Sequence, residues 1–488
     1  MIPAALPCLA VLAPLDLAVV GISVALLLVV SWVFGREEKD TTDFFLGGRK
    51  VPPLAASLSF VATEISALTL VSFPHTAYSE NWRWLQFFIG QILARIVVAW
   101  LFIPAFYHHN CTSIYQFLRH RFGPQTQYAG SAFFFVTRLL GSGLRLYAAS
   151  MAVAVILQWP LWTTLFLFTV VSILFIAFGG IKAVVWAGAY QAVVFLSAGV
   201  VLILYLLNHI DGGVTAAWQT AQAADKMSIF NFHFSWSDHT IFWAGVANGC
   251  FVAMAAFGAD QEMVQRLLTV RTARASQKTI LSTIITVLPA YWMYLIVGTL
   301  LYVFYTNPQT TPPVEAKKVL SHFVLTSLPV GLKGFILAAI ILASIDSPLS
   351  SLTSSFVTDI YRPLIRRNAS ETHYLFVSRI GVVAFGLVLV GIAFACTGVD
   401  NLVWKAFELV GLPACALLGV FLFGLLTRRT ANGSNILAML TGSIITTALW
   451  ILIQMEIITL AWTWLIVIGT TITFITAFVL ATPGSRPS

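Results

Sequence analysis

The sequence predicts an all-α, polytopic membrane protein with about thirteen transmembrane helices in a single transmembrane domain, residues 1–488. Composition is the first reason, because 59% of the 488 residues are hydrophobic and 9% are charged, whereas about a quarter of a soluble domain is charged. The second reason is a series of apolar stretches close to the roughly 20 residues that cross a bilayer core. The third is that basic residues concentrate in alternate loops.

The predicted spans follow one another with loops too short to form an extramembrane domain. The first span has no basic segment before its apolar run, so we expect a retained helix rather than a cleaved signal peptide. The five cysteines show neither pairing nor metal-site spacing, which argues against a disulfide framework or a zinc site. In chain order the spans are 15–34, 52–75, 82–106, 126–157, 160–178, 181–208, 239–268, 276–306, 334–361, 373–396, 402–426, 433–454 and 459–482.

Loop charges predict the orientation of these spans. With the N-terminus outside, seventeen lysines and arginines fall in inner loops and five in outer loops, as the positive-inside rule requires. An odd number of spans then places the C-terminus in the cytoplasm, and we expect an integral, multi-pass protein of the cell (inner) membrane. The net charge of +8 is therefore interpreted as an insertion signal spread over many loops, and no nucleic-acid partner is expected.

A polar stripe interrupts the apolar span at 338–361. At 100° per residue, its hydroxyl side chains fall on one face less than about 90° wide; they are Ser344, Ser347, Ser351, Ser355 and Thr358. Small polar residues can simply allow close helix packing. Asp346 beside the stripe, together with Pro348, which frees the carbonyl of Ser344, favours a site for a hard cation, since such ions bind hydroxyl, carbonyl and carboxylate oxygens.

Two further segments carry polar or small residues in the middle of predicted spans. Residues 57–78 contain Glu64 and end near Pro74, and residues 247–269 combine small residues with a charged inner end. A Pro-kinked but continuous helix is one interpretation of the first segment. Broken helices at matching positions of two halves are typical of inverted-repeat transporters. We therefore expect two five-helix repeats, about 52–208 and 239–426, preceded by one helix (15–34) and followed by two (433–482).

Several motifs, taken together, resemble those of the sodium:solute symporter family. They occur in the family's order and are "DFFLGGRKVP" (43–52), "ATEISALT" (62–69), "TSIYQFLRHRFG" (112–123), "GGIKAVVW" (179–186), "DQEMVQRLLT" (260–269), "SIDS" (344–347), "TDIY" (358–361) and "LLTRR" (425–429). The resemblance implies a leucine-transporter-like, five-plus-five fold and sodium-coupled symport, with Na⁺ as the only expected ion or cofactor.

The resemblance also implies positions for sodium. The family's main site takes backbone carbonyls at positions matching Ala62 and Ile65, and residues matching Ile340, Ala343 and Ser344. The chain departs from the family at Ala343, where a second hydroxyl is usual. Members similar to sialic acid symporters have an additional site with an aspartate where this chain has Gly188, and that site also draws on positions matching Ala343, Asp346 and Ser347. One sodium ion is the simplest expectation; the alternative is that Asp346 supplies the missing carboxylate.

The expected substrate is a small organic anion such as a monocarboxylate. Sugar-binding members have polar residues where this chain has Ala253 and Ala256, and a polyol would leave hydroxyls without partners there. The residues expected near the substrate cavity are Glu64, Ser66, Thr69, Gln86, Ala253 and Phe257. Arg138 and Arg145 share one helix face, either as a carboxylate clamp or as structural partners of Glu64, Asp260 or Glu408. The surrounding sequence looks closest to members that carry monocarboxylates, vitamins and inorganic anions.

The expected function is sodium-coupled symport by alternating access, with a small solute, sodium and the lipid bilayer as partners. Proton coupling is a close alternative because Glu64, Asp260 and Asp346 lie within predicted spans. A sugar or amino-acid substrate and a sensor without an output domain are further alternatives. We expect no enzyme, because no nucleophile–base pair or metal-ligand cluster has catalytic spacing. The solute, the number of sodium ions and the oligomeric state stay open.

Overall fold

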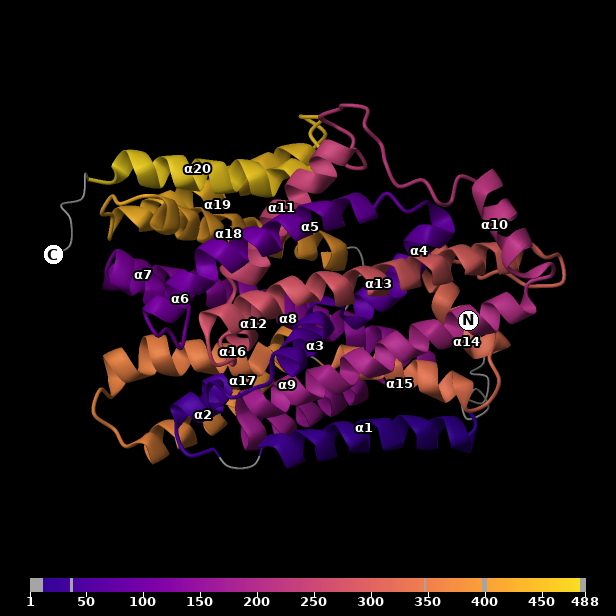
Figure 1. The fold of residues 1–488 in the computed structure, drawn as a ribbon, viewed down its shortest axis with the longest axis horizontal. Helices are drawn as coiled ribbons and strands as arrows, with labels where there is room; N and C mark the ends of the chain where they lie inside the picture. Colours follow the sequence, from indigo (N-terminus) through magenta and orange to yellow (C-terminus); the bar gives the residue numbers. More distant parts are fainter. Residues whose placement is uncertain (1–11, 36–37, 346–347, 397–401, 483–488) are drawn as a thin grey trace.

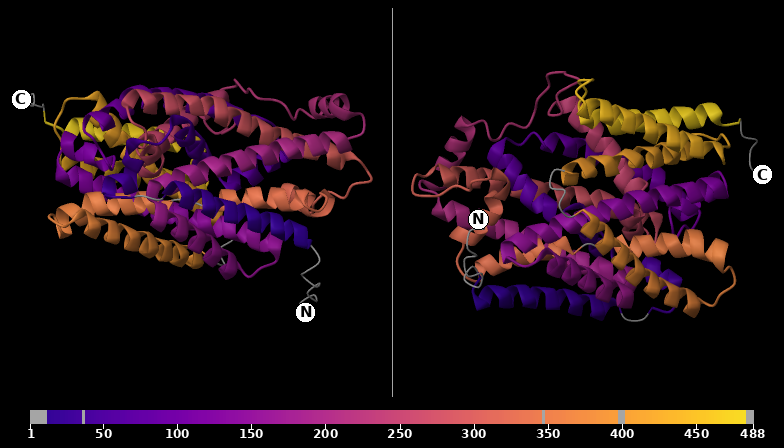
Figure 2. Two further views of the ribbon diagram at one scale, coloured as in Figure 1. Left: turned by 60° about the horizontal axis from the view of Figure 1, so that its bottom comes forward. Right: turned by 180° about the vertical axis from the view of Figure 1, so that it is seen from behind.

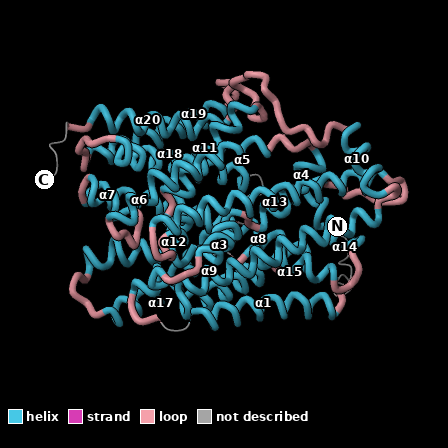
Figure 3. The backbone as a smooth tube through the Cα atoms, in the orientation of Figure 1, coloured by secondary structure: helices cyan, strands magenta, loops and turns pink. Residues whose placement is uncertain are grey.

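The computed structural model describes residues 12–35, 38–345, 348–396 and 402–482. These residues form helices and loops; the only bridge between extended segments in the described ranges is an isolated antiparallel one between Thr430 and Thr482. The all-α prediction is confirmed (Figure 3). By length and composition, eight described helices could cross a membrane, or up to ten if each of two bent pairs is one span. The predicted number of thirteen is not confirmed.

The first half of the chain begins with one long helix and continues with a broken one. Its elements are α1 (Pro14–Gly35), α2 (Thr41–Leu46), η1 (Gly47–Arg49), α3 (Pro53–Glu64), α4 (Ala67–Ser79), α5 (Leu85–Val97), η2 (Val98–Phe102), α6 (Ile103–His108), α7 (Tyr115–Arg121), α8 (Pro124–Leu157), α9 (Leu161–His209) and α10 (Gly213–Ala223). The spans predicted at 160–178 and 181–208 both lie in α9, which breaks at Gly180 (φ 47°, ψ −143°).

The second half contains the other bent pair and a helix interrupted in its middle. Its elements are α11 (Phe242–Gly258), α12 (Gln261–Leu267), α13 (Ala273–Thr306), η3 (Ala316–Lys318), α14 (Val319–Ser327), α15 (Leu332–Ser344), α16 (Pro348–Ser355), η4 (Phe356–Ile365), α17 (Glu371–Ala395), α18 (Leu402–Leu426), α19 (Ser434–Gln454), η5 (Trp462–Trp464) and α20 (Leu465–Leu480).

The two halves interlock instead of forming separate bodies. In Figure 1 most long helices run roughly along the longest axis of the molecule. α5 packs against α11, and α3 and α4 pack against α13, so each broken helix of one half meets helices of the other. α1 and α17 both contact α9 along one edge, and α18, α19 and α20 form a group at the opposite edge (Figures 1 and 2).

Buried carboxylates join elements that are distant in sequence. Asp16 in α1 accepts hydrogen bonds from the backbone N–H groups of Gly331 (2.7 Å) and Gly334 (2.8 Å), which caps the start of α15. Asp359 in η4 accepts from the Ser113 hydroxyl (2.6 Å) and from the Gln127 amide (2.9 Å). The motifs at 112–123 and 358–361 therefore meet through one carboxylate.

Candidate functional site

The first broken helix stops in the middle of its span. α3 ends at Glu64, Ile65 and Ser66 have extended backbone, and the chain resumes as α4 with a bend of 58°. The Ile65 N–H bonds the Val61 carbonyl at 2.8 Å, whereas the later carbonyls of a helix end have no intrahelical donor. The broken-helix interpretation is confirmed, whereas the binding of a ligand by backbone oxygens around 62–65 stays a prediction.

A second break interrupts the polar stretch predicted as one continuous helix. α15 ends at Ser344, α16 begins at Pro348, and the residues from Phe356 to Ile365 wind as a π-helix. The prediction that the hydroxyls over 344–358 share one face requires an unbroken helix of 100° per residue. The break after Ser344 and the π-helix from Phe356 make this prediction wrong. The effect predicted for Pro348, a loosened helix around Ser344, agrees with the observed break. Asp346 and Ser347 lie outside the described residues.

One face of α9 lies between these two breaks. The Gln191 amide donates to the carbonyls of Leu342 (2.9 Å) and Ile345 (3.3 Å), at the end of α15. One turn earlier, a Cβ at Gly188 would lie 2.6 Å from the Ser59 hydroxyl of α3. Because residues 188 and 191 are neighbours on one helix face, the middle of α3 and the end of α15 contact the same part of α9. The close contact with Ser59 also leaves no room for a carboxylate at position 188.

The hydroxyl expected to bind sodium faces its own helix. Ser344 is buried and donates from its Oγ to the Ile340 carbonyl at 2.8 Å. This bond uses the hydroxyl hydrogen and leaves the oxygen lone pairs available. Ala343, half-buried, contributes no side-chain oxygen. α15 also packs against α4, the outer half of the first broken helix.

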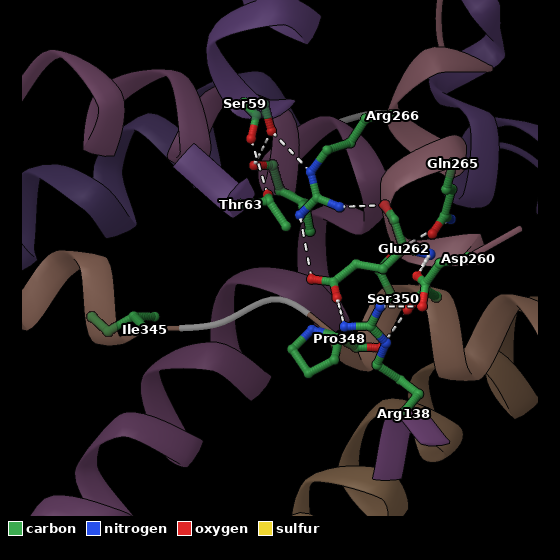
Figure 4. A network of polar contacts seen from close by, with 12 residues as sticks. Ser59, Thr63, Arg138, Asp260, Glu262, Gln265, Arg266, Ile345, Pro348 and Ser350 are labelled. Atoms are coloured by element: carbon green, nitrogen blue, oxygen red, sulfur yellow. Dashed lines mark hydrogen bonds and ion pairs between the residues drawn. The ribbon is translucent and has the colours of Figure 1, made fainter. Parts of the chain in front are cut away.

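The second bent pair and α8 contribute to a largely buried cluster of charges, which we call the α12 network: Arg138, Asp260, Glu262 and Arg266 (Figure 4). α11 and α12 meet at 68° at the Ala259–Asp260 break, and Asp260 caps α12 by accepting from the Glu262 N–H at 2.9 Å. Arg138 of α8 forms ion pairs with both Asp260 and Glu262. The structural interpretation of Arg138 is thereby favoured over a free carboxylate clamp.

Arg266 extends the network to the first broken helix. Its Nε donates to the Ser59 hydroxyl (3.2 Å) and its Nη1 donates to the Glu262 carbonyl (2.5 Å). Two glutamines continue these contacts around α12. Gln261 bonds the backbone of Ile114 (2.9 Å) and Thr112 (3.0 Å), and Gln265 donates to the Phe45 carbonyl (2.8 Å). All seven residues of α12 are buried, so this short helix is held in place by polar side chains.

Glu64 belongs to a second buried charge pair. Its carboxylate accepts from Arg95 of α5 at 2.5 Å and from the Tyr291 hydroxyl at 3.2 Å. Arg95 is fully buried, donates also to Thr283 (2.9 Å), and lies 4.6 Å from the centre of the Phe257 ring. The pair connects α3, α5 and α13. Glu64 therefore braces three helices, and its expected place beside the substrate cavity stays a prediction.

The remaining candidates for the substrate site differ in their surroundings. The amide of buried Gln86 donates to the carbonyls of Arg83 (3.1 Å) and Thr240 (2.9 Å) and accepts from the Asn231 N–H (3.1 Å). Its polar groups are thus engaged with neighbouring backbone groups, and its expected place at the substrate cavity stays a prediction.

Ala253 and Phe257 are buried, and Phe257 packs on Phe60 with ring centres 5.0 Å apart. Ser66, which makes no side-chain cap bond, and Thr69 are half-buried at and just beyond the break. Arg145 is half-buried, two turns from Arg138 on α8. Glu408 is one of the helix residues whose surroundings the structure does not describe. Ser66, Thr69 and Arg145 stay predictions.

Sequence analysis missed two residues that organise this region. Arg95 is a base within the span predicted at 82–106, but no sequence pattern links it to Glu64, 31 residues earlier. Gln191 follows Gly188 by one turn and bonds the end of α15, 151 residues later. The available signal was polarity inside an apolar span, which indicates that a partner exists without identifying it.

A model of the family described as "Sodium:solute symporter family" matches residues 44–442. The sodium/sialic acid symporter NanT of Aliivibrio fischeri is 29% identical over 435 residues, which are 87% of this chain and 85% of that protein. The sodium/iodide cotransporter of Homo sapiens is 26% identical over 85% of this chain and 65% of that protein. Sodium-coupled monocarboxylate transporter 2 of Danio rerio is 25% identical over 80% of this chain and 64% of that protein.

Solved structures show a similar arrangement of helices. The substrate-bound, outward-open state of a Na⁺-coupled sialic acid symporter has a TM-score of 0.85 at 26% identity, covering 96% of this chain and 97% of that one. A nucleobase-cation-symport-1 family transporter has a TM-score of 0.52 at 13% identity, over 88% of this chain and 92% of that one. The second similarity concerns the fold alone. The leucine-transporter-like fold implied by the motifs is confirmed.

Proposed function

The chain belongs to the sodium:solute symporter family, a family of transporters rather than enzymes, and we propose that it couples the entry of one sodium ion to the import of a small organic anion. The observation that carries the proposal is the packing of parts of two interrupted helices, α3 of one and α15 and α16 of the other, against α9. Helix ends inside a membrane leave backbone oxygens that suit an alkali cation.

The sodium ion would be held by oxygens of both helix ends. In this proposal the carbonyls of Ala62 and Ile65 face the Ile340 and Ala343 backbone, and Ser344 adds its hydroxyl oxygen. The end of α3 supplies the oxygens without intrahelical donors, and Ser344 retains free lone pairs. A single ion is proposed because the close contact between Gly188 and Ser59 excludes a carboxylate from α9.

The anionic character of the solute rests on the relatives. The named relatives carry sialic acid, monocarboxylates or iodide, and all of these are anions. Ser66 and Thr69, half-buried beside the α3/α4 break, are the proposed hydroxyl contacts. Arg145, half-buried on α8 two turns from Arg138, is the proposed cationic contact.

The proposed membrane orientation follows from the loop charges. With the N-terminus outside and the C-terminus in the cytoplasm of the cell (inner) membrane, α3 and α12 form the cytoplasmic halves of their broken helices. The backbone N–H of Val51, just before α3, bonds the Thr269 carbonyl, just after α12, at 3.2 Å. Both half-helices therefore end on the same side of the molecule.

Uptake into proteoliposomes tests the coupling ion. A screen of small carboxylates, sugars and amino acids by thermal unfolding, with and without sodium, first identifies the solute. We then expect uptake under an inward sodium gradient at equal pH, and no uptake under a proton gradient without sodium. Uptake driven by the proton gradient alone would refute sodium coupling, and stabilisation by a neutral sugar alone would refute the anionic solute.

A serine substitution tests the sodium site. Ser344→Ala should raise the sodium concentration for half-maximal uptake by roughly tenfold, because the loss of one charge-assisted oxygen contact is worth about 1.4 kcal/mol. Ser378→Ala is the matched control, since Ser378 is also buried and also donates to the carbonyl four residues earlier (2.7 Å), in α17. Equal sodium dependence in both variants would exclude Ser344 from the site.

A further inference from the structure

Arg379 is a lone cation within a membrane-spanning helix. It lies in α17 (Glu371–Ala395), eight residues from the start of the helix, which is about 12 Å along the axis. Its side chain is exposed, and it forms no ion pair or hydrogen bond with a described residue. A charge in a transmembrane helix is costly and indicates a functional contact, and a long arginine side chain can reach the headgroup region from this depth.

Two apolar grooves flank one aromatic side chain beside this arginine. A groove of about 470 Å³ between α9 and α17 is lined by Phe178, Phe376 and Ile380, with Arg379 in its wall. A groove of about 330 Å³ between α1 and α9 is lined by Trp32, Leu174 and again Phe178. The ring of Phe178 is 69% exposed, so it separates the two grooves on the outer surface of the helices.

Among the described residues, the other charges near Arg379 leave its positive charge uncompensated. The Nζ of Lys182 lies 3.7 Å from the Asp43 carboxylate, so these two groups balance each other. Glu38 is the other acid that the described part of the chain places near Arg379. Burial is the main reason that the pKa of Glu38 is raised to about 8. The positive charges of Arg379 and Lys182 oppose this shift, and the negative charge of Asp43 adds to it. At neutral pH Glu38 is therefore mainly protonated.

We propose that an anionic phospholipid binds here, with its phosphate on Arg379 and its two acyl chains in the grooves on either side of Phe178. A molecule with two apolar tails joined to one negative head matches two grooves that adjoin one cation. Basic positions between transmembrane helices on the cytoplasmic side bind anionic headgroups. The leaflet is cytoplasmic in the proposed orientation, and the site does not depend on which solute is transported.

Native mass spectrometry of the purified, delipidated protein tests the proposal. The full-length protein is incubated with phosphatidylglycerol or with phosphatidylcholine of the same chain length, and bound lipids are counted. We expect tighter binding of phosphatidylglycerol, and a roughly fivefold loss of that preference in Arg379→Gln. Arg379→Lys should retain most of the preference because it keeps the charge. Phe178→Ala should weaken the binding of both lipids.

Arg428→Gln is the matched control. Arg428 is another exposed arginine, in the loop after α18, and its loss should leave lipid binding unchanged. Equal binding of the two lipids by the wild-type protein would overturn the proposal, as would an unchanged preference in Arg379→Gln. Displacement of phosphatidylglycerol by inorganic phosphate alone would show that the arginine binds a free anion, which also overturns it. Thermal unfolding of each variant without lipid confirms that the variant is folded.

Discussion

Replacing Glu38 by glutamine should stabilise the protein at alkaline pH, because Glu38 is a buried carboxyl group without a hydrogen-bond partner. Both of its oxygens are shielded from solvent and accept no hydrogen bond in the described structure. One of them, Oε1, lies against Gly180, the break in α9. Burial is the largest cause of its raised pKa, which moves from 4.5 to about 8; Arg379 and Lys182 oppose this shift and Asp43 adds to it.

The sign and size of the effect follow from proton linkage. Between pH 4.5 and about 8 the folded protein holds a proton on Glu38 that the unfolded chain has released, so the folded state loses stability as pH rises through this window. The shift of roughly 3.5 pKa units corresponds to about 4 to 5 kcal/mol above pH 8. Glutamine has nearly the same shape and no charge, so Glu38→Gln should remove this penalty.

Thermal unfolding, followed by the fluorescence of the 15 tryptophans, measures the effect in detergent at pH 5, 7 and 9. The midpoint of Glu38→Gln should match the wild-type midpoint near pH 5 and exceed it increasingly towards pH 9. Glu80→Gln, at an exposed glutamate, should follow the wild-type curve throughout. A difference between Glu38→Gln and wild type that is constant from pH 5 to pH 9 would refute the buried, neutral carboxyl.

Three further substitutions test the contacts around the site. Glu64→Ala should lower the free energy of unfolding by about 3–5 kcal/mol, because it leaves the fully buried Arg95 without its carboxylate partner. The double variant Glu64→Ala/Arg95→Met should recover part of this loss, measured by thermal unfolding. Gly188→Asp should abolish uptake rather than create a second sodium site and raise the sodium Hill coefficient. The Cβ of the new side chain would lie 2.6 Å from the Ser59 hydroxyl, which is too close for an undisturbed backbone. Gly180→Ala should lower the unfolding midpoint by several degrees, because the residue has φ +47° and its Cβ would lie 2.5 Å from the Phe44 carbonyl oxygen; an unchanged midpoint would contradict the described backbone.

The helix breaks were largely predictable from the sequence. Thr63, Glu64 and Ser66 interrupt an apolar run where α3 stops, and Pro348 lacks the N–H that would continue α15. The small residues of the segment 247–269 predicted a broken helix there but not the position of the break, and α11 is helical as far as Gly258. The break occurs one residue before Asp260 instead, because the aspartate caps a new helix with its own side chain.

The choice of partners was not predictable in the same way. The face that Arg95 presents to Glu64, and the face of α9 that presents Gln191 to α15, depend on how helices from both halves rotate and pack. Helix periodicity fixes which residues share a face, but it does not determine which other face they meet. Arg138 illustrates this point. The sequence allowed it either to bind a substrate carboxylate or to form structural ion pairs, and the position of α12, which brings Asp260 and Glu262 to it, favours the ion pairs.

The balance of buried charge leads to a prediction about coupling. The Arg95–Glu64 pair is neutral, and the α12 network contains two arginines and two carboxylates. Neither cluster therefore supplies a net negative charge to an entering sodium ion. An anionic solute about 5 Å from the ion would contribute about 3 kcal/mol at an effective dielectric constant of about 20, so ion and anion should bind cooperatively. Because coupling is reciprocal, saturating solute should lower the sodium concentration for half-maximal stabilisation, and sodium should tighten solute binding by the same factor in calorimetry. The uncharged amide of the same solute should show little coupling, and equal coupling for acid and amide would refute this electrostatic explanation.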